Sequence, residues 1–272
     1  MGRTMEISGR TALLTGATGG LGRAIAQALA IRGATLVLSS RKEEELAELA
    51  AALPGEGHRT LVTELGSDGA GEELAETASA GGPVDILVAN AGLPGTGRLE
   101  DLTPEEITRV LHVNLESPIR ASRALLPAML DRGIGHFVYV SSLAGKTPSP
   151  RSSMYNASKF GLRGFAHAFR QDLRGTGVSA SLVLPGFIRE AGMFADAEMS
   201  APAGMGTSSP QEVGDAVVRA IESDKAEIVV APPQQRAVAA LGSTFPAIAA
   251  IAQRGQGEKI AEELAAKQSS KR

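Results

Sequence analysis

Hydrophobic residues along the chain fall into short continuous runs, separated by longer stretches with helical periodicity. Each short run is apolar throughout rather than alternating, which is expected for strands of a parallel sheet that helices cover on both faces. We therefore predict about seven strands, at residues 11–15, 35–40, 61–64, 85–89, 136–142, 178–184 and 227–231. The intervening stretches predict helices at residues 23–30, 42–53, 72–80 and 209–222, from residue 103 towards 132, and from residue 154 onwards.

Two of the predicted helices begin with a capping box. Thr103 is an N-cap residue, with Pro104 at the first helical position and Glu106 closing the box, and Ser209 and Glu212 repeat the pattern. Strands and helices therefore alternate along the sequence. This order predicts an α/β fold, a Rossmann-like doubly wound parallel sheet with helices on both faces.

No linker or internal repeat divides the chain, so we expect a single domain at residues 1–254. Residues 187–208 are rich in Ala, Gly, Met and Ser, and we interpret them as a mobile substrate loop or lid. Residues 236–252 are mostly apolar but too short to span a bilayer, so we predict that they pack on the substrate cleft or on another subunit. The charged tail at residues 255–272 is expected to fray.

Composition narrows the range of functions. The chain has 272 residues, a formal net charge of −3 and no cysteine. The absence of cysteine excludes disulfides, thiolate catalysis and zinc–sulfur sites, and it fits a reducing cytoplasm, where we expect the protein. The net charge does not suggest a nucleic-acid surface, and no run reaches the ~18 apolar residues of a membrane span. The four histidines are scattered, so we expect no metal site.

The strongest chemical signal lies between Ser142 and Lys159. Tyr155 and Lys159 are four residues apart on a predicted helix and so share a face. An ammonium near a phenol favours the phenolate and lowers the phenol's pKa. Ser142, at the end of a predicted strand, could hold a substrate oxygen near the phenol. The arrangement suits proton transfer to or from a carbonyl or alcohol oxygen, although the stretch alone is equally compatible with a surface Tyr–Lys pair.

A glycine-rich turn connects the first predicted strand to the first predicted helix. The sequence Gly-Ala-Thr-Gly-Gly-Leu-Gly occupies residues 16–22. Glycines in this position allow a tight turn and the close approach of a pyrophosphate, which the positive end of the helix dipole stabilises. The strand before and the helix after the turn favour a cofactor site over a merely flexible turn.

With these pieces in place, the sequence resembles the short-chain dehydrogenase/reductase family over about residues 10–231. The matching motifs are TGxxxGxG at residues 15–22, Asn90-Ala91-Gly92, a helix asparagine at Asn114, a serine at Ser142, YxxxK from Tyr155 to Lys159, and the turn Pro185-Gly186. The glycine turn also fits the GxxGxxG pattern of the longer, epimerase-like branch. The short length, the Asn-Ala-Gly motif and the serine spacing favour the shorter oxidoreductase branch.

The resemblance implies hydride transfer between a nicotinamide cofactor and a carbonyl or secondary alcohol. Tyr155 would be the general acid in reduction and the base in oxidation. Lys159 would lower the pKa of Tyr155 and bond the nicotinamide ribose, while Ser142 would bond the substrate oxygen. Asn114 would hold a water that links Lys159 to solvent. Pro118 lies four residues after Asn114 and has no N–H, so the Asn114 carbonyl is available to that water.

The same resemblance implies which residues bind the cofactor. They are Gly16, Thr18, Gly19, Gly20, Leu21, Gly22, Ser40, Arg41, Glu64, Leu65, Asn90, Ala91, Gly92, Tyr155, Lys159, Pro185, Gly186 and Ile188. Two positions depart from the family pattern. Glu190 stands where members often carry a threonine that bonds the nicotinamide carboxamide, and Glu64 stands where an aspartate near the adenine is common.

We predict NADP(H) rather than NAD(H) as the preferred cofactor, with NAD(H) possible. An enzyme that uses NAD commonly places Asp or Glu at the end of the second strand, where it accepts from the ribose 2′-hydroxyl. Here the strand ends in Ser39-Ser40 and is followed by Arg41, whose planar guanidinium suits a phosphate. Glutamates at positions 43–45 could weaken the positive field.

Two other functions remain compatible with the residues. A nucleotide-sensing binding protein of the same fold would be expected to lack Tyr155 or Lys159, and both are present. An epimerase or dehydratase that retains its cofactor would show no net change in nicotinamide absorbance. We expect a small ketone or alcohol substrate and a homodimer or homotetramer.

Overall fold

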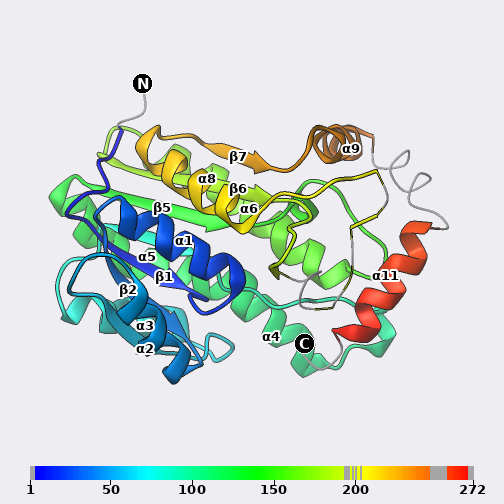
Figure 1. Cartoon of the computed structure of the whole chain (residues 1–272), viewed down its shortest axis with the longest axis horizontal. Coiled ribbons are helices and arrows are strands. Elements are labelled where there is room, and N and C mark those ends of the chain that lie inside the picture. The colour runs from blue at the N-terminus through cyan, green and yellow to red at the C-terminus, as the bar shows by residue number, and fades with distance from the viewer. Residues whose placement is uncertain are drawn as a thin grey trace.

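The computed structural model of the protein describes residues 4–192, 197, 199, 201–202, 204–245 and 256–268. Seven strands form one parallel sheet in the order β3-β2-β1-β4-β5-β6-β7. The strands are β1 (Thr11–Thr15), β2 (Thr35–Ser40), β3 (Arg59–Val62), β4 (Ile86–Ala89), β5 (Gly135–Val140), β6 (Val178–Pro185) and β7 (Glu227–Val230). This is the doubly wound sheet that the sequence predicts (Figure 1).

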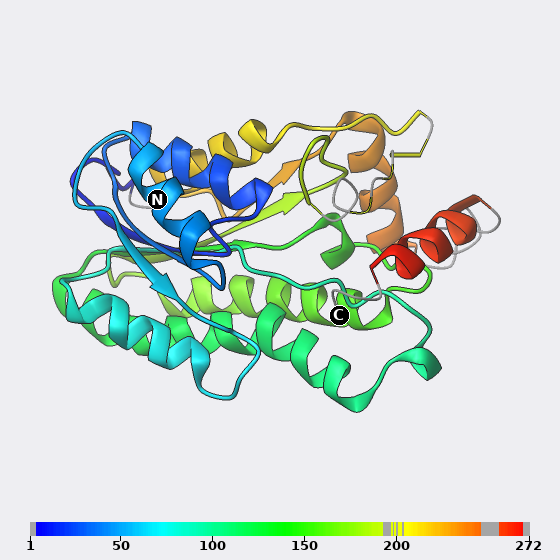
Figure 2. The ribbon, with the colours of Figure 1, turned by 60° about the horizontal axis from the view of Figure 1, so that its bottom comes forward.

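Helices cover both faces of the sheet. They are α1 (Gly20–Ile31), α2 (Glu43–Ala52), α3 (Ala70–Ala80), α4 (Pro104–Leu111), α5 (Ser117–Arg132), α6 (Ser153–Asp172), α8 (Pro210–Glu222), α9 (Pro233–Thr244) and α11 (Gln256–Lys267). Buried side chains of α1, α2 and α8 form one apolar cluster with the sheet, and those of α3, α5 and α6 form another. Figure 2 shows the two layers, with the blue α1 and yellow α8 on one side and the green α5 and α6 on the other.

The capping boxes are confirmed. The Thr103 hydroxyl accepts from the backbone N–H of Glu106, whose carboxylate accepts from the backbone N–H of Thr103. Ser209 and Glu212 make the same reciprocal pair at the start of α8. Each helix therefore begins where its sequence signal indicates, because two of its otherwise unpaired N–H groups are satisfied locally.

The edge strand β3 differs from the sequence-based expectation. It spans Arg59–Val62 instead of residues 61–64, and its residues alternate between partly buried and exposed. Within the described residues it pairs only with β2, with Val37 opposite Arg59 and Ser40 opposite Val62. An edge strand is less buried than a central one, so the rule of continuous apolar runs does not locate it well.

The helix expected to run from residue 103 towards 132 is divided into three parts. Between α4 and α5, residues His112–Glu116 form a π-helical turn, η2, in which the Ser117 N–H donates to the His112 carbonyl. Pro118 follows directly and has no N–H to offer the Asn114 carbonyl four residues earlier. A single π turn at such a point widens the helix, and such turns are frequent at functional sites.

The C-terminal part of the chain also differs from expectation. Residues Gln256–Lys267 form helix α11, whereas fraying was expected for residues 255–272. Leu264 and Ala265 are buried, the Thr96 hydroxyl donates to Gln268 across 2.9 Å, and Arg151 pairs with Glu262 at 3.1 Å. These contacts hold the tail against the rest of the domain, and its charge alone did not indicate them.

Of the apolar segment at 236–252, residues 246–252 lie outside the described residues. Across the described residues, no helix is both long and apolar enough to cross a bilayer.

Candidate active site

The candidate residues gather at the carboxyl ends of the strands. In an open parallel sheet, ligands bind where the strand order reverses, which here is between β1 and β4. The glycine turn follows β1, Asn90-Ala91-Gly92 follows β4, Ser142 follows β5 and Pro185-Gly186 ends β6. The parallel topology thus brings together motifs that are far apart in the sequence.

The glycine turn forms a cradle that side chains would fill. A Cβ atom at Gly16, where φ is +65°, would lie 2.9 Å from the Ala91 Cα. One at Gly22 would lie 2.1 Å from the Gly16 carbonyl oxygen. Helix α1 begins with no acidic residue in its first turn and no side-chain cap, so its positive end is available to an anion. The residues present therefore fit a dinucleotide pyrophosphate.

Asn90 holds the glycine turn in place. Its side-chain amide donates to the carbonyls of Thr15 and Gly16, each at 3.1 Å. The Thr15 hydroxyl accepts from the backbone N–H groups of Asn90 and Ala91 at 3.0 and 3.1 Å. Thr15 therefore connects the glycine turn to the segment after β4. The sequence identified it only as the first residue of the TGxxxGxG motif. Leu21 packs against the core cluster of α1, and Arg23 donates to the Thr18 carbonyl at 3.0 Å.

Tyr155 and Ser142 lie together at the start of α6 and the end of β5. The Ser142 hydroxyl hydrogen-bonds the Tyr155 phenol, and its oxygen also accepts from the Ala144 N–H at 3.1 Å. Burial raises the pKa of Tyr155, and the bond from Ser142 opposes that rise. The sequence led us to expect Lys159 to lower this pKa. In the structure burial is the dominant influence on this pKa, and Lys159, whose Nζ lies 5.7 Å from the centre of the Tyr155 ring, is not among its causes.

Lys159 is only 3% exposed. Its Nζ donates to the Val140 carbonyl at 3.2 Å, and no carboxylate lies within ion-pair distance among the described residues. Burial lowers the pKa of Lys159 to about 8. Ser141, one residue before Ser142, is buried as expected and donates to the Lys159 carbonyl at 3.3 Å.

Gly92 lies between Lys159 and Asn114. A Cβ atom at Gly92 would lie 3.5 Å from both the Lys159 Nζ and the Asn114 Oδ1. Asn114 is fully buried, and its side chain makes reciprocal bonds with the Leu93 backbone at 2.7 and 2.9 Å. Its amide also donates to the Ser158 hydroxyl at 3.1 Å. The Asn114 side chain is therefore fully engaged, which leaves its backbone carbonyl as the group that could serve a proton relay.

Two supporting residues were not identified from the sequence. Asn156 accepts from the Ser149 N–H and donates to the carbonyls of Ala144 and Thr147, so it fixes the loop between Ser142 and Tyr155. Gln235, on α9, is 2% exposed and accepts from the Phe187 N–H at 2.9 Å. No motif marks either position, because each acts through backbone groups that only the fold brings near.

Gln235 ties together the two ends of the segment at 187–208. Besides its bond to Phe187, it donates to the carbonyls of Met205 and Gly206 at 3.2 and 2.9 Å. Ile188 is buried and forms an isolated parallel bridge with Ser208. Residues 193–196, 198, 200 and 203 of the predicted loop lie outside the described residues. Both ends of the segment are therefore anchored beside the Pro185-Gly186 turn.

Glu190, at the place where the family often has threonine, is exposed and adopts a left-handed φ of +65°. The neighbouring Ala191 approaches the glycine turn so closely that a Cβ at Gly20 would lie 2.5 Å from the Ala191 Cβ. The segment after Pro185-Gly186 therefore passes over the start of α1.

The end of β2 presents polar groups towards the expected adenosine site. The Ser40 Oγ accepts from the Lys42 N–H at 3.1 Å, which leaves its hydroxyl hydrogen able to donate. Arg41 pairs with Glu64 at 3.2 Å, and both side chains are about half exposed, at 54% and 46%. Leu65 is buried in the core, and its carbonyl accepts from the Ser117 hydroxyl at 2.8 Å.

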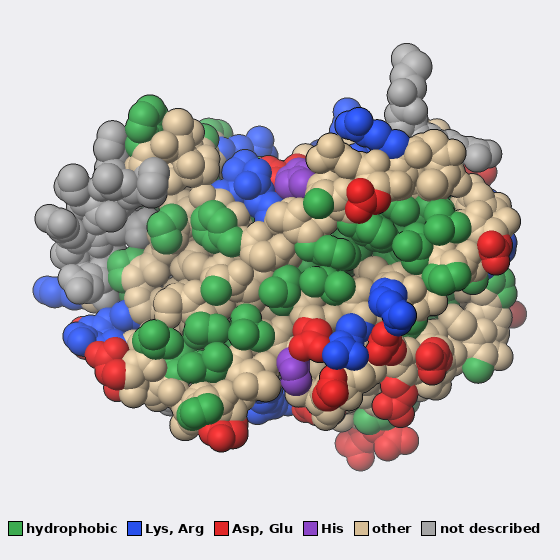
Figure 3. Space-filling view, turned by 180° about the vertical axis from the view of Figure 1, so that it is seen from behind, with side chains coloured by type: hydrophobic (Ala, Val, Ile, Leu, Met, Phe, Trp, Pro, Cys, Tyr) green, Lys and Arg blue, Asp and Glu red, His purple; other side chains and the backbone are tan. Residues whose placement is uncertain are grey.

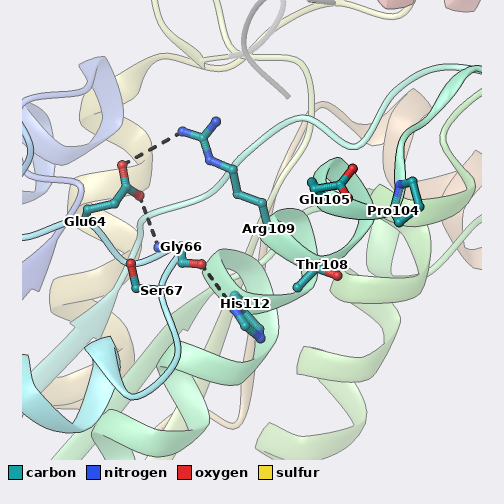
Figure 4. Close-up of a pocket in the computed structure, with 8 residues that line it drawn as sticks. All are labelled: Glu64, Gly66, Ser67, Pro104, Glu105, Thr108, Arg109 and His112. Carbon is teal, nitrogen blue, oxygen red and sulfur yellow. Dashed lines mark hydrogen bonds and ion pairs between the residues drawn. The ribbon is translucent and has the colours of Figure 1, made fainter.

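Beside Glu64 lies a pocket of about 500 Å³ (Figure 4). Its walls are formed by Glu64, Gly66, Ser67, Pro104, Glu105, Thr108, Arg109 and His112. Glu64 accepts from the Gly66 N–H at 3.1 Å, and the Gly66 carbonyl lies 3.1 Å from the His112 Nδ1. The pocket therefore extends from Glu64, at the expected adenine end of the cofactor site, to helix α4.

A family model described as short chain dehydrogenase matches residues 10–200. The chain belongs to the short-chain dehydrogenase family. The match spans the glycine turn, the Asn-Ala-Gly motif, Ser142 and the Tyr155–Lys159 pair. The family recognised from the sequence motifs is therefore confirmed.

Named relatives and solved structures agree with this assignment. The chain is 39% identical to ketoacyl reductase HetN of Nostoc sp. over 82% of this chain and 79% of that one. It is 37% identical to human dehydrogenase/reductase SDR family member 4 over 70% of this chain and 69% of that one. It is also similar to a 3-oxoacyl (acyl-carrier-protein) reductase of Agrobacterium tumefaciens C58 with NADP bound. That match has a TM-score of 0.76 and 30% identity over 82% of this chain and 93% of that one.

These findings establish the general activity. This short-chain dehydrogenase is an NAD(P)-dependent oxidoreductase that transfers hydride between a nicotinamide cofactor and a carbonyl or secondary alcohol. The comparisons give no support to a nucleotide-sensing protein or an epimerase.

Proposed function

We propose that the enzyme is an NADP(H)-preferring carbonyl reductase and alcohol dehydrogenase in which Tyr155 is the general acid and base. The observation that carries the catalytic assignment is the hydrogen bond between the Ser142 hydroxyl and the Tyr155 phenol, beside the buried ammonium of Lys159. A substrate oxygen that takes the place of this mutual bond would accept a hydrogen bond from each of the two hydroxyls. The two groups would then orient the carbonyl and supply its proton.

Each residue has a distinct role in this proposal. The raised pKa of Tyr155 keeps the phenol protonated at neutral pH, so it can donate to the oxygen as reduction proceeds. The Lys159 ammonium then stabilises the phenolate, which regains its proton from solvent by a relay through the region of the Asn114 carbonyl. When bound, the nicotinamide supplies or accepts the hydride. The whole dinucleotide would be held by the glycine turn of residues 16–22, Asn90-Ala91-Gly92, Pro185-Gly186 and Ile188.

The preference for NADP(H) is supported by the residues at the end of β2. Ser40 can donate to a 2′-phosphate oxygen, and the Arg41 guanidinium can bond two of its oxygens. The last residue of the strand is Ser40, where an NAD enzyme would commonly place a carboxylate. The solved structures of similar chains from Agrobacterium tumefaciens and Thermococcus sibiricus hold NADP and 5-hydroxy-NADP.

The test is cofactor binding to the wild type and to Arg41→Ala, measured by nicotinamide fluorescence. We expect the wild type to prefer NADPH, and the variant to lose roughly 1.5–3 kcal/mol of NADPH affinity, the range for hydrogen bonds to charged groups. NADH affinity should change little. Equal losses for both cofactors, or a wild type that prefers NADH, would reject Arg41 as the reader of the 2′-phosphate.

The substrate class is best searched among 3-oxoacyl compounds and simple ketones. A ketoacyl reductase and a 3-oxoacyl reductase are among the similar proteins, and the proposed acid–base pair suits a 3-oxo group. A panel of 3-oxoacyl thioesters, simple ketones, aldehydes and secondary alcohols should be assayed with both cofactors. Net oxidation of NADPH with at least one carbonyl compound is expected. A product isomerised without net change in nicotinamide absorbance would instead favour an epimerase.

We also propose a cytoplasmic homodimer or homotetramer. The face seen from behind carries broad groups of hydrophobic side chains (Figure 3). Leu130 on α5 and Phe160 on α6 are 39% and 41% exposed. On α9 and just after it, Val238, Leu241 and Phe245 are 42%, 47% and 52% exposed, which supports a role for the segment at 236–252 in subunit contacts. Light scattering of the wild type and of Phe160→Glu should report a smaller particle for the variant.

A further inference from the structure

Glu64 lies between two arginines that belong to different parts of the fold. Its Oε2 is 3.2 Å from the Arg41 Nη1, after β2, and 3.9 Å from the Arg109 Nη2, on α4. Its other oxygen, Oε1, accepts from the Gly66 N–H at 3.1 Å. One carboxylate oxygen is therefore shared by two guanidinium groups, while the second fixes the carboxylate to the backbone. Figure 4 shows Glu64 and Arg109 facing one another across the mouth of the pocket.

We infer that Glu64 is a specificity-determining residue that limits the preference for NADP(H) by competing with the 2′-phosphate for Arg41. This inference rests on the proposed role of Arg41. A bound 2′-phosphate would have to share Arg41 with the carboxylate or displace it. The carboxylate's own charge would also repel the phosphate dianion. NADH carries no 2′-phosphate, so its binding would not meet this opposition.

Arg109 makes the competition reversible. Because both guanidiniums approach the same oxygen, Glu64 keeps an ion-pair partner when Arg41 turns to a phosphate. The three side chains are between 39% and 54% exposed, so the exchange buries no charge and costs little. The pocket of about 500 Å³ beside them leaves room for the Glu64 and Arg109 side chains to move.

A different role for Glu64 predicts the opposite result. The family often places an aspartate near the adenine at this position, and a carboxylate there would help both cofactors equally. Glu64→Gln separates the two roles. The amide still accepts from the Gly66 N–H, so the local turn is preserved, but the negative charge opposite Arg41 is removed.

The experiment measures the dissociation constants of NADPH and NADH for the wild type and its variants. Glu64→Gln is expected to raise the ratio of NADPH to NADH affinity about two- to fivefold, the effect of one exposed ion pair. Glu105→Gln is the matched control, because Glu105 lines the same pocket on the far side of Arg109 from Glu64 (Figure 4). It should leave the ratio unchanged. In the Arg41→Gln background, the gain from Glu64→Gln should fall to the smaller part that direct repulsion of the phosphate contributes.

The outcomes distinguish the role inferred for Glu64 from the proposal that Arg41 binds the 2′-phosphate. If Arg41→Gln alone lowers the affinity for both cofactors equally, the proposed reading of the 2′-phosphate fails. If Arg41→Gln is selective for NADPH but Glu64→Gln weakens both cofactors in parallel or leaves the ratio unchanged, only the role of Glu64 is overturned. If Glu105→Gln raises the ratio of NADPH to NADH affinity as much as Glu64→Gln does, the effect comes from general surface charge, and the role of Glu64 is also overturned.

Discussion

Helix α6 contributes to two charged centres that differ in how their charges are compensated. Lys159, near the start of the helix, is 3% exposed, and its Nζ has a backbone carbonyl as its hydrogen-bond acceptor. Further along, Arg163 and His167 bond the carboxylate of Glu227, at the start of β7, at 2.7 and 2.9 Å. Lys146 bonds the other oxygen of Glu227 at 2.9 Å.

The pKa values record this difference. Burial lowers the pKa of Lys159 to about 8, because no nearby carboxylate compensates the ammonium within the part of the chain that the structure describes. Burial tends to raise the pKa of Glu227, but hydrogen bonds from Arg163, Lys146 and His167 outweigh it and bring that pKa to about 2. A buried charge without a counter-ion costs stability, whereas a well-paired one contributes it only while the pair is intact. The first arrangement indicates a functional group and the second a structural one.

The largest effect is expected at the proposed catalytic centre. Tyr155→Phe removes the only ionisable atom of that side chain and should lower turnover by roughly 10²-fold or more, since general acid–base catalysis contributes ~10²–10⁴. Cofactor affinity should be nearly unchanged. Steady-state kinetics and NADPH titration of the same preparation check both statements. A variant with near-normal turnover would mean that another residue supplies the proton.

Lys159→Met should lower turnover and cofactor affinity while stabilising the fold. Removing a buried charge whose pKa is depressed should raise the free energy of unfolding by about 1–3 kcal/mol at pH 7. The unfolded lysine binds its proton more tightly, so the wild type gains stability as pH rises from about 8 to about 10.5. The advantage of the variant should therefore shrink over that range. Urea denaturation at about pH 7 and about pH 9.5 measures it, and a variant less stable than the wild type would contradict the comparison.

Glu227→Gln should do the reverse and destabilise the enzyme without changing kcat/KM. The folded pKa of Glu227 lies below its unfolded value, so the pair adds stability at neutral pH. That contribution is lost as pH falls from about 4.5 towards 2. A loss of about 1–3 kcal/mol at pH 7 is expected for breaking a partly buried charged network. Glu263→Gln, which removes the exposed pair with Lys267, is the control and should change stability little. If both variants change the free energy of unfolding equally, the Glu227 network has no special structural role, and the contrast with Lys159 fails.

The smallest effect is expected from Pro118→Ala. The new N–H can bond the Asn114 carbonyl, which competes with its use in a proton relay. Turnover should fall by up to about tenfold, the value of one hydrogen bond. The solvent isotope effect should rise, because proton transfer becomes slower relative to hydride transfer. Unchanged kinetics and isotope effect would remove the Asn114 carbonyl from the relay.

The sequence was most informative where function requires particular residues at fixed spacings. The glycine turn, the Asn90 motif and the Tyr155–Lys159 pair predicted the family. Both capping boxes also predicted their helices, because the bonds they make are local. Local chemistry of this kind depends on neighbours in the chain and can be predicted from them.

Tertiary structure decided the features that depend on groups far apart in the chain. The charge of the last residues predicted fraying, but α11 is held in place because Thr96 and Arg151, more than 100 residues away, offer it partners. Gln235 anchors a distant loop by bonding its backbone, for which no sequence pattern exists.

The same holds for the pKa of Tyr155. Sequence spacing brought Lys159 onto the same helix face, but the pKa depends on burial, which all the surrounding elements determine together. The sequence by itself thus determined the family and the sheet, and it named the groups that are proposed to react. The fold decided how deeply those groups are buried and which distant side chains hold them, because both are sums over contacts that no local stretch contains.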